Sequence, residues 1–298
     1  MNVLNIGSMN LDTVYQVPHF VQPGETLHAL GVSVHCGGKG LNQSIALARA
    51  GAPVYHAGCI GPGGEMLVDA LNGSGVDTRF IRKIDAPQGS ALIQVNPEGE
   101  NCIIVYGGSN QAITPQLLEE VLSQFVPGDY LVLQNEVNDP ERIIETAYAK
   151  GLKIVLNPSP VDERILQVDF RKITWLLINE VEAQQICGQQ EPELVWNALH
   201  EKYPALNLLM TRGSRGAVCF TGEEAVRQDA FRVQAVDTTA AGDTFTGYFV
   251  AGIMEGITIS ECLKRAACAS AIAVTRPGAG DSVPTVAEVE QTLKEWDK

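Results

Sequence analysis

The chain has 298 residues, of which 45% are hydrophobic and 19% charged, a composition typical of a soluble globular protein. Its formal net charge of −14 argues against nucleic acid or an anionic membrane as a partner. The seven cysteines are scattered and never spaced as C-x-x-C, which favours reduced thiols in the cytoplasm and gives no zinc signature. Because the N-terminus has no basic region and no apolar run reaches about 18 residues, we expect neither a signal peptide nor a membrane span.

The first third of the chain mixes one buried strand with irregular short strands. In chain order, the sequence predicts a strand at 3–7, short strands within 14–36, a helix from 41, a strand at 54–60, a helix at 63–73 and a β-hairpin at 90–106. The remainder alternates between helices and strands. We expect helices starting near 115, 140, 180 and 193, strands at 130–134, 153–156, 174–178 and 206–210, a hairpin at 217–227, and helices at 243–254, 260–275 and 286–296.

This alternation, with nearly continuous apolar strands, predicts an α/β fold in which helices cover both faces of a mostly parallel sheet. The irregular strands and the hairpin do not fit that rhythm. We therefore expect a single domain, 1–298, with a small β lid contributed by about 13–36 and 90–106. Ligands bind such sheets at the carboxyl ends of the strands. Polar residues that directly follow predicted strands should therefore share one edge: Asn10, Glu136, Asn157, Asn179 and Thr211.

The stretch from 236 to 250 reads as a loop that runs into a helix. Ala241 and Gly242 leave the backbone accessible to a ligand. The first amides of a helix lack internal partners and carry partial positive charge, so they bind anions. Asp243 lies in the same turn and could act as a base for a hydroxyl group, which phosphoryl transfer requires. The alternative is that Asp243 only caps the helix.

A second stretch, from Gly37 to Gln43, places three glycines beside a lysine and an asparagine. The glycines let the backbone approach a ligand, and Lys39 and Asn42 offer charge and hydrogen bonds. The alternative is an ordinary glycine-rich turn. Two more features could bind sugar hydroxyls, namely Asn10-x-Asp12 and Glu136, although both also fit turns or solvated loops.

Further along, Asn179 and Glu182 fit a capping box at the start of a helix. Their functional alternative is to orient water molecules around magnesium, which keeps several waters and needs few protein ligands. The turn from Thr211 to Gly216 could hold phosphate or ribose, or could simply be a hairpin turn. Neither a P-loop nor a dinucleotide fingerprint is present in the sequence, so a nucleotide would have to bind by other means.

Taken in this order, the motifs resemble the ribokinase-like, phosphofructokinase B-type sugar kinases over essentially the whole chain. Two signatures carry the resemblance, Gly38-Lys39-Gly40-Leu41-Asn42-Gln43 and Asp237-Thr238-Thr239-Ala240-Ala241-Gly242-Asp243-Thr244-Phe245. Supporting matches are Gly7-Ser8-Met9-Asn10-Leu11-Asp12, Gln134-Asn135-Glu136, Asn157-Pro158-Ser159-Pro160, Asn179-x-x-Glu182 and Thr211-x-Gly213-Ser214-Arg215-Gly216. The resemblance implies a three-layer α/β/α sandwich with a small β lid.

The resemblance also implies roles for individual residues. Asp243 would be the base, and the amides of Ala241, Gly242 and Asp243 the anion hole. The sugar would be held by Asn10, Asp12, Gly38, Lys39, Gly40, Asn42 and Glu136. ATP would be bound by Asn179, Thr211, Gly213, Ser214, Arg215, Gly216 and Gly242. Glu182 would help to place Mg²⁺ through water, and an activating monovalent cation such as K⁺ would lie near Asp237, Thr239, Ala273, Arg276, Gly278 and Ser282.

The expected reaction is ATP-dependent phosphorylation of a sugar's primary hydroxyl, with D-ribose as the first candidate and a homodimer formed through the lid. Leu11 and the stretch Gly107-Gly108-Ser109-Asn110 depart from the family pattern near the sugar. Kinases for fructose, a keto-deoxy sugar, pseudouridine or another nucleoside are therefore alternatives, as is a non-catalytic sugar-binding protein.

Overall fold

Two β-sheets organise the computed structural model of the protein, which describes residues 1–296. The larger sheet has nine strands in the order β13-β12-β11-β10-β9-β8-β1-β4-β5. Their bounds are β1 Val3–Ile6, β4 Val54–Ile60, β5 Asp77–Lys83, β8 Tyr130–Gln134, β9 Lys153–Asn157, β10 Trp175–Asn179, β11 Asn207–Thr211, β12 Ala217–Thr221 and β13 Glu224–Gln228. All pairs from β5 across to β11 are parallel, whereas β12 pairs antiparallel with both β11 and β13.

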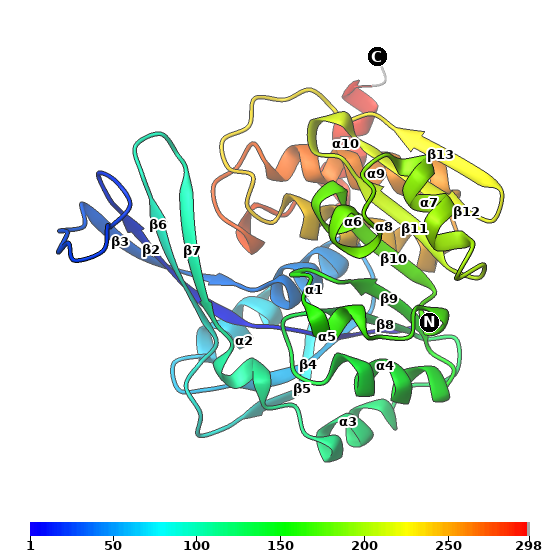
Figure 1. Ribbon diagram of the computed structural model, residues 1–298, viewed down its shortest axis with the longest axis horizontal. Helices are drawn as coiled ribbons and strands as arrows, with labels where there is room; N and C mark the ends of the chain where they lie inside the picture. Colours follow the sequence, from blue (N-terminus) through cyan, green and yellow to red (C-terminus); the bar gives the residue numbers. More distant parts are fainter. Residues whose placement is uncertain (297–298) are drawn as a thin grey trace.

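Helices cover both faces of this sheet, as the sequence predicts (Figure 1). The helices are α1 Lys39–Arg49, α2 Glu65–Gly73, α3 Pro115–Leu122, α4 Pro140–Ala149, α5 Glu163–Leu166, α6 Glu180–Cys187, α7 Pro192–His200, α8 Ala241–Glu255, α9 Ile259–Ala273 and α10 Val286–Trp296. Successive strand residues point to opposite faces, so in β8 Val132 joins the core beneath α1, α8 and α9, and Leu131 joins the core beneath α3, α4 and α7. The result is a three-layer α/β/α sandwich.

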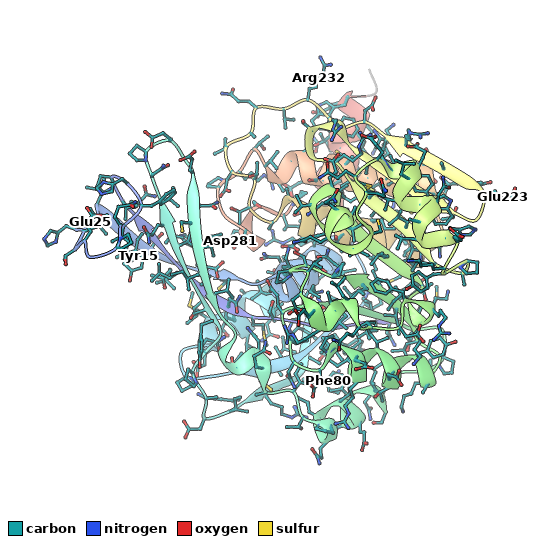
Figure 2. The ribbon with its side chains drawn as sticks, viewed as in Figure 1. Tyr15, Glu25, Phe80, Glu223, Arg232 and Asp281 are labelled. Carbon is teal, nitrogen blue, oxygen red and sulfur yellow. The ribbon has the colours of Figure 1, made fainter. Side chains whose placement is uncertain are left out.

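The smaller sheet has the order β3-β2-β6-β7, with bounds β2 Asn10–Gln16, β3 Gly31–Gly37, β6 Ser90–Val95 and β7 Asn101–Tyr106. Its central pair, β2 and β6, is parallel, and the two outer pairs are antiparallel. This second sheet projects from the body at the left of Figure 1, and Figure 2 places Tyr15 and Glu25 on the projecting part. Strand β2 starts at Asn10, somewhat earlier than expected, so Asn10 and Asp12 belong to this sheet.

The structure contains some elements that the sequence did not predict. Strand β5 lies at the edge of the large sheet, and of its residues only Phe80 is buried, so its sequence DTRFIRK lacks the apolar run of a central strand. Short segments are also hard to predict, because one turn has too few residues to show a period. They comprise α5 and the 3₁₀ turns η1 Gly108–Gln111, η2 Phe170–Lys172, η3 Gly213–Arg215 and η4 Gly280–Ser282.

The other general expectations concern membranes and thiols. No helix in the described part of the chain is long and apolar enough to span a bilayer. The seven cysteines are present as thiols.

Candidate active site

Polar residues gather at the carboxyl edge of the large sheet, as the sequence predicts. Gln134, Asn157, Asn179 and Thr211 are the last residues of the adjacent strands β8, β9, β10 and β11. Asn10 opens β2 a few residues after β1 ends. Because these strands are parallel neighbours, their ends form one continuous rim onto which the helices α1 and α8 are placed.

Asp243 lies in the first turn of α8, and its side chain faces helix α1. Its Oδ2 accepts a hydrogen bond from Asn42 Nδ2 at 3.2 Å, and its Oδ1 accepts one from Gln43 Nε2 at 2.9 Å. The N-cap residue is Ala240, and no side chain caps this helix. The capping alternative for Asp243 is therefore wrong: its carboxylate is buried and is held between two amides of another helix.

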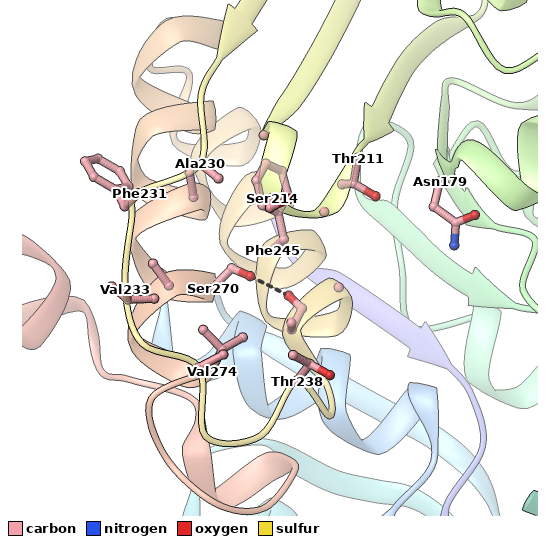
Figure 3. Close-up of a pocket in the computed structure, with 17 residues that line it drawn as sticks. Asn179, Thr211, Ser214, Ala230, Phe231, Val233, Thr238, Phe245, Ser270 and Val274 are labelled. Atoms are coloured by element: carbon pink, nitrogen blue, oxygen red, sulfur yellow. Dashed lines mark hydrogen bonds between the residues drawn. The ribbon is translucent and has the colours of Figure 1, made fainter. Parts of the chain in front are cut away.

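The N-terminus of α8 presents an accessible backbone. A Cβ atom built on Gly242 would meet nothing within 4 Å, so the space in front of this residue is open. Ala240 precedes the helix with φ 57, a left-handed conformation that is uncommon for a residue with a side chain. Ser270 of α9 donates to the Ala241 carbonyl at 3.0 Å, drawn as a dashed line in Figure 3. These contacts fix the first turn with its amides toward open space, an arrangement suited to an anion.

Close packing of glycines determines where α1 begins. Gly38 has φ 94, and a Cβ on Gly40 would lie 2.4 Å from the backbone nitrogen of Ser8. The amide of Leu41 donates to the Ser8 carbonyl at 2.8 Å. Helix α1 can therefore start directly against the end of β1, which brings Asn42 and the Lys39 amide to the rim. The glycine-rich stretch is thus a structural requirement as well as a candidate binding segment.

The predicted sugar-binding residues come together at this rim. Glu136 Oε2 accepts hydrogen bonds from the Ser8 hydroxyl and, at 3.1 Å, from the Lys39 amide. Asp12 Oδ1 and Asn42 Oδ1 are buried without a hydrogen-bond partner in the described structure. Buried polar atoms are almost always paired. Two acceptors left open among residues predicted to hold a sugar are what a ligand with hydroxyl donors would satisfy.

The charges of this group are strongly coupled. Burial and the neighbouring Glu136 raise the pKa of Asp12 to about 7, and burial also raises the pKa of Glu136. Burial alone would lower the pKa of Lys39, but the carboxylates of Asp243, Glu136 and Glu182 outweigh it and raise this pKa. Lys39 is therefore the positive charge within a ring of acidic groups. Without a ligand, the Asp12–Glu136 pair is under repulsion.

We expect Asp12→Asn to stabilise the ligand-free protein and to weaken sugar binding. The folded-state pKa of Asp12, about 7, exceeds its ordinary value of 3.8, so between these pH values the folded state binds more protons than the unfolded state and the Asp12 contribution to stability falls as pH rises. The melting temperature of the variant should therefore exceed that of the wild type by more at pH 8 than at pH 5. Thermal scans at both pH values measure this; an equal difference at the two would contradict the assignment.

A cavity of about 450 Å³ lies beside Gly242, and most of the residues predicted to bind ATP line it. Figure 3 shows Asn179 and Thr211 on one side and Phe231 and Val233 on the other. The full lining comprises Asn179, Thr211, Gly213, Ser214, Gly216, Ala230, Phe231, Val233, Ala235, Thr238, Ala241, Gly242, Phe245, Ala267, Ser270, Ala271 and Val274. This cavity and the sugar-binding group meet at the first turn of α8.

Three residues predicted to bind ATP or to help place magnesium also make other contacts. Arg215 does not line the cavity, and its guanidinium pairs with Glu180. Asn179 Oδ1 accepts from the Glu182 amide at 2.9 Å, and Glu182 Oε2 accepts from the Asn179 amide at 3.0 Å. The capping box is thus confirmed. Glu182 is also one of the three carboxylates whose charge raises the pKa of Lys39.

The residues predicted to hold a monovalent cation lie in two segments of the chain, which hydrogen bonds to Asp237 hold together. Asp237 Oδ1 accepts from the Thr239 amide at 2.9 Å, and Oδ2 accepts from the Gly278 amide at 3.0 Å. Burial alone would raise the pKa of Asp237, but these hydrogen bonds outweigh it and lower this pKa. Ser282 donates its hydroxyl to the Ala279 carbonyl at 2.7 Å. The hydrogen bond from Gly278 to Asp237 therefore joins the segment before α8 to the segment after α9.

Sequence reasoning missed several residues that hold the site in place. Gln43 lies within the first signature, yet its contact with Asp243 depends on a helix 200 positions away. Asn110 donates to Asn10 Oδ1 at 2.7 Å and accepts from the Met9 amide at 2.9 Å. The wall around Phe231 was missed too. This segment is neither helix nor strand. The sequence therefore gives only one sign of a buried wall there, the alternation of Phe231, Val233 and Ala235 with polar residues.

Comparison with known proteins identifies the family of the chain. Residues 1–286 match the family model described as pfkB family carbohydrate kinase. The chain is 34% identical to a ribokinase of Haemophilus influenzae, over 97% of both chains, and 28% identical to a deoxyribokinase of Salmonella typhi, over 98% of this chain and 99% of that one. It superposes with a TM-score of 0.86 on the structure of Arabidopsis thaliana ribokinase complexed with ribose and ATP, at 29% identity and 98% coverage of each chain. The chain therefore belongs to the pfkB family and is an ATP-dependent carbohydrate kinase.

Proposed function

We propose that the protein transfers the γ-phosphoryl group of ATP to the primary hydroxyl of D-ribose, giving D-ribose 5-phosphate. The observation that carries this proposal is the meeting of two sites at the first turn of α8. On one side lie the unpaired acceptors Asp12 Oδ1 and Asn42 Oδ1, and on the other the cavity with Asn179 and Thr211. The relatives named ribokinase and the neighbour bound to ribose and ATP support ribose as the substrate.

In this proposal Asp243 acts as the base. Its carboxylate accepts the proton of the sugar hydroxyl while the hydroxyl oxygen bonds to the γ-phosphorus, and the bond from that phosphorus to the ADP oxygen breaks. The amides of Ala241, Gly242 and Asp243 stabilise the charge on the transferring group. The Asn42 side chain can contact both Asp243 and the sugar. Its Nδ2 donates to Asp243, and its Oδ1 has no hydrogen-bond partner among the described residues.

The remaining predicted residues complete the site. Asn10, Asp12, Gly38, Lys39, Gly40, Asn42 and Glu136 hold the sugar; Asn179, Thr211, Gly213, Ser214, Arg215, Gly216 and Gly242 hold ATP. Mg²⁺ neutralises phosphate charge when bound, and Glu182 would accept from one of its water molecules. K⁺ would be bound by carbonyls of the loop that Asp237 pins, together with Thr239, Ala273, Arg276, Gly278 and Ser282. The two amides that donate to the Asp237 carboxylate hold the segments of this loop together, which supports the assignment.

A substrate panel tests this proposal. ADP release should be fastest with D-ribose when it is compared with 2-deoxy-D-ribose, D-fructose, pseudouridine and a keto-deoxy sugar, and potassium should increase the rate over that in a bulky organic cation. A preference for 2-deoxy-D-ribose would instead assign deoxyribose as the substrate, the alternative that the relative named deoxyribokinase suggests. Equal rates with and without potassium would remove the cation site.

We further propose that the chain is a single kinase unit, that the second sheet is a lid over the sugar and that two copies dimerise through it in the cytoplasm. The outer part of this sheet exposes large apolar side chains: Leu30, Val32, Val34, Leu92, Ile103, Ile104, Val105 and Tyr106. Apolar clusters of this kind commonly mark interaction surfaces. Strand β2 also connects this surface directly to Asn10 and Asp12.

A further inference from the structure

We propose that Gln43 is a positioning residue that keeps the Asp243 carboxylate correctly oriented, and that a buried chain of polar side chains ending at His56 fixes Gln43 for this task. The inference rests on the proposed role of Asp243 as the base. Gln43 lies in α1, is fully buried and donates from Nε2 to Asp243 Oδ1 at 2.9 Å. Its second Nε2 hydrogen goes to Asn157 Oδ1, at 3.1 Å.

The orientation of Gln43 is set by its neighbour Gln134 at the end of β8. Gln134 Nε2 donates to Gln43 Oε1 at 2.7 Å and to Asn5 Oδ1 at 3.1 Å. Because Gln43 Oε1 is occupied by this donor, the NH₂ group of Gln43 must face Asp243. Gln134 Oε1 is buried without a hydrogen-bond partner among the described residues.

The chain continues to a histidine that has only one available protonation pattern. Asn5 Nδ2 donates to Ser44 Oγ at 2.9 Å, and Ser44 lies 2.8 Å from His56 Nδ1. His56 Nε2 lies 3.2 Å from the Gly7 carbonyl, which can only accept. Burial lowers the pKa of His56 to about 4, so the ring is neutral at pH 7. Its Nε2 therefore carries the proton and its Nδ1 accepts from Ser44, which leaves the Ser44 oxygen to accept from Asn5.

Apart from Gln134 Oε1, the donors and acceptors that link His56 to Asp243 therefore each have a single assignment. A network with one direction can hold one side-chain orientation better than isolated pairs. Three charged side chains also contribute to the electrostatics of this site, namely Lys39, Glu136 and Glu182. Gln43 differs from them because it contacts the carboxylate oxygen directly without adding charge.

The test is Gln43→Met, which keeps the length of the side chain and removes its donors. We expect kcat to fall about 10- to 100-fold, the cost of one hydrogen bond to a charged group. The Michaelis constant for the sugar should stay near the wild-type value, because Gln43 does not reach the predicted sugar-binding atoms. This split between kcat and the Michaelis constant marks a residue that acts through Asp243, because a damaged pocket would weaken sugar binding as well.

Two further variants separate positioning from a purely structural role. Gln134→Met should lower kcat by less than Gln43→Met, again with a near-normal Michaelis constant, and the double variant should be no worse than Gln43→Met, since both act through one contact. Gln134→Met also provides the test if Gln43→Met does not fold. Gln88 is the matched control, a buried glutamine that donates to the Met9 carbonyl at 2.6 Å and accepts from the Gly61 amide at 2.9 Å. Gln88→Met should lose stability, while the kcat of the folded protein stays near the wild-type value.

Wild-type kcat in the folded Gln43 and Gln134 variants would overturn the inference, as would a rise in the Michaelis constant for the sugar that accounts for the whole loss of kcat/KM. The proposed function fails separately, through Asp243→Asn. If that variant loses turnover while the Gln43 variant keeps wild-type turnover, Asp243 remains the base and only the positioning role is wrong.

Discussion

Replacing Asp243 with asparagine is expected to lower kcat by about 10²- to 10⁴-fold, the usual contribution of a positioned base. Asparagine keeps the size of the side chain, so the fold and the sugar-binding group should remain. It has only one oxygen, however, whereas Asn42 and Gln43 each donate to a separate oxygen of Asp243. The variant therefore loses both the proton acceptor and one of its supporting hydrogen bonds.

Steady-state kinetics with saturating ATP and magnesium measure this effect, and calorimetric titration with the sugar provides the control. We expect sugar affinity to change little while turnover collapses. Turnover within about tenfold of the wild type would contradict the assignment of Asp243 as the base. Loss of sugar binding together with turnover would point instead to a damaged pocket.

Gly247→Ala is expected to impair both stability and turnover, because α1 and α8 touch at this residue. A Cβ on Gly247 would lie 2.4 Å from Ala46 Cβ and 2.8 Å from the Leu47 amide nitrogen. Such overpacking typically costs about 1–3 kcal/mol. The two helices would have to move apart, and they carry Asp243 on one side and Asn42 and Gln43 on the other. A shift of about 1 Å can cost about 100-fold in rate, so we expect kcat to fall by more than the folded fraction.

The matched control is Gly73→Ala at the end of α2, where an added Cβ meets nothing within 4 Å. Alanine is favoured over glycine in helices by about 0.5–1 kcal/mol, so this variant should be as stable as the wild type or slightly more stable. Thermal unfolding and kinetics of the two variants measured side by side give the comparison. Equal behaviour of the two alanines would mean that α1 and α8 are not in tight contact.

Much of the site could be predicted from the sequence because its residues lie in short, continuous stretches at the ends of predicted strands. Thr211 and Asn179 follow apolar runs, and the parallel sheet brings such ends together whatever the intervening loops are. Gly38 and Gly40 were recognisable as part of a glycine-rich stretch. The structure explains the glycines, because only small residues fit where α1 meets β1. The capping box was readable because its partners lie only three residues apart.

Contacts between distant segments could not be predicted from one sequence. The sequence around Gln43 does not indicate that this side chain contacts Asp243. The sequence around Asn110 does not indicate its hydrogen bond to Asn10. Local patterns reveal which residues are buried, whereas the pairing of buried polar groups depends on the packed fold. Strand β5 was missed for a related reason: a mostly polar edge strand acquires its structure from its parallel neighbour β4.

The position of the transferred phosphate tests the central claim most directly. Phosphorus NMR of a reaction containing the protein, ATP, magnesium and D-ribose should show a phosphate ester coupled to the two protons of C5. The same mixture with Asp243→Asn should show almost none of it over the same time. A phosphate on the anomeric oxygen, or no sugar phosphate with any member of the substrate panel, would contradict the account.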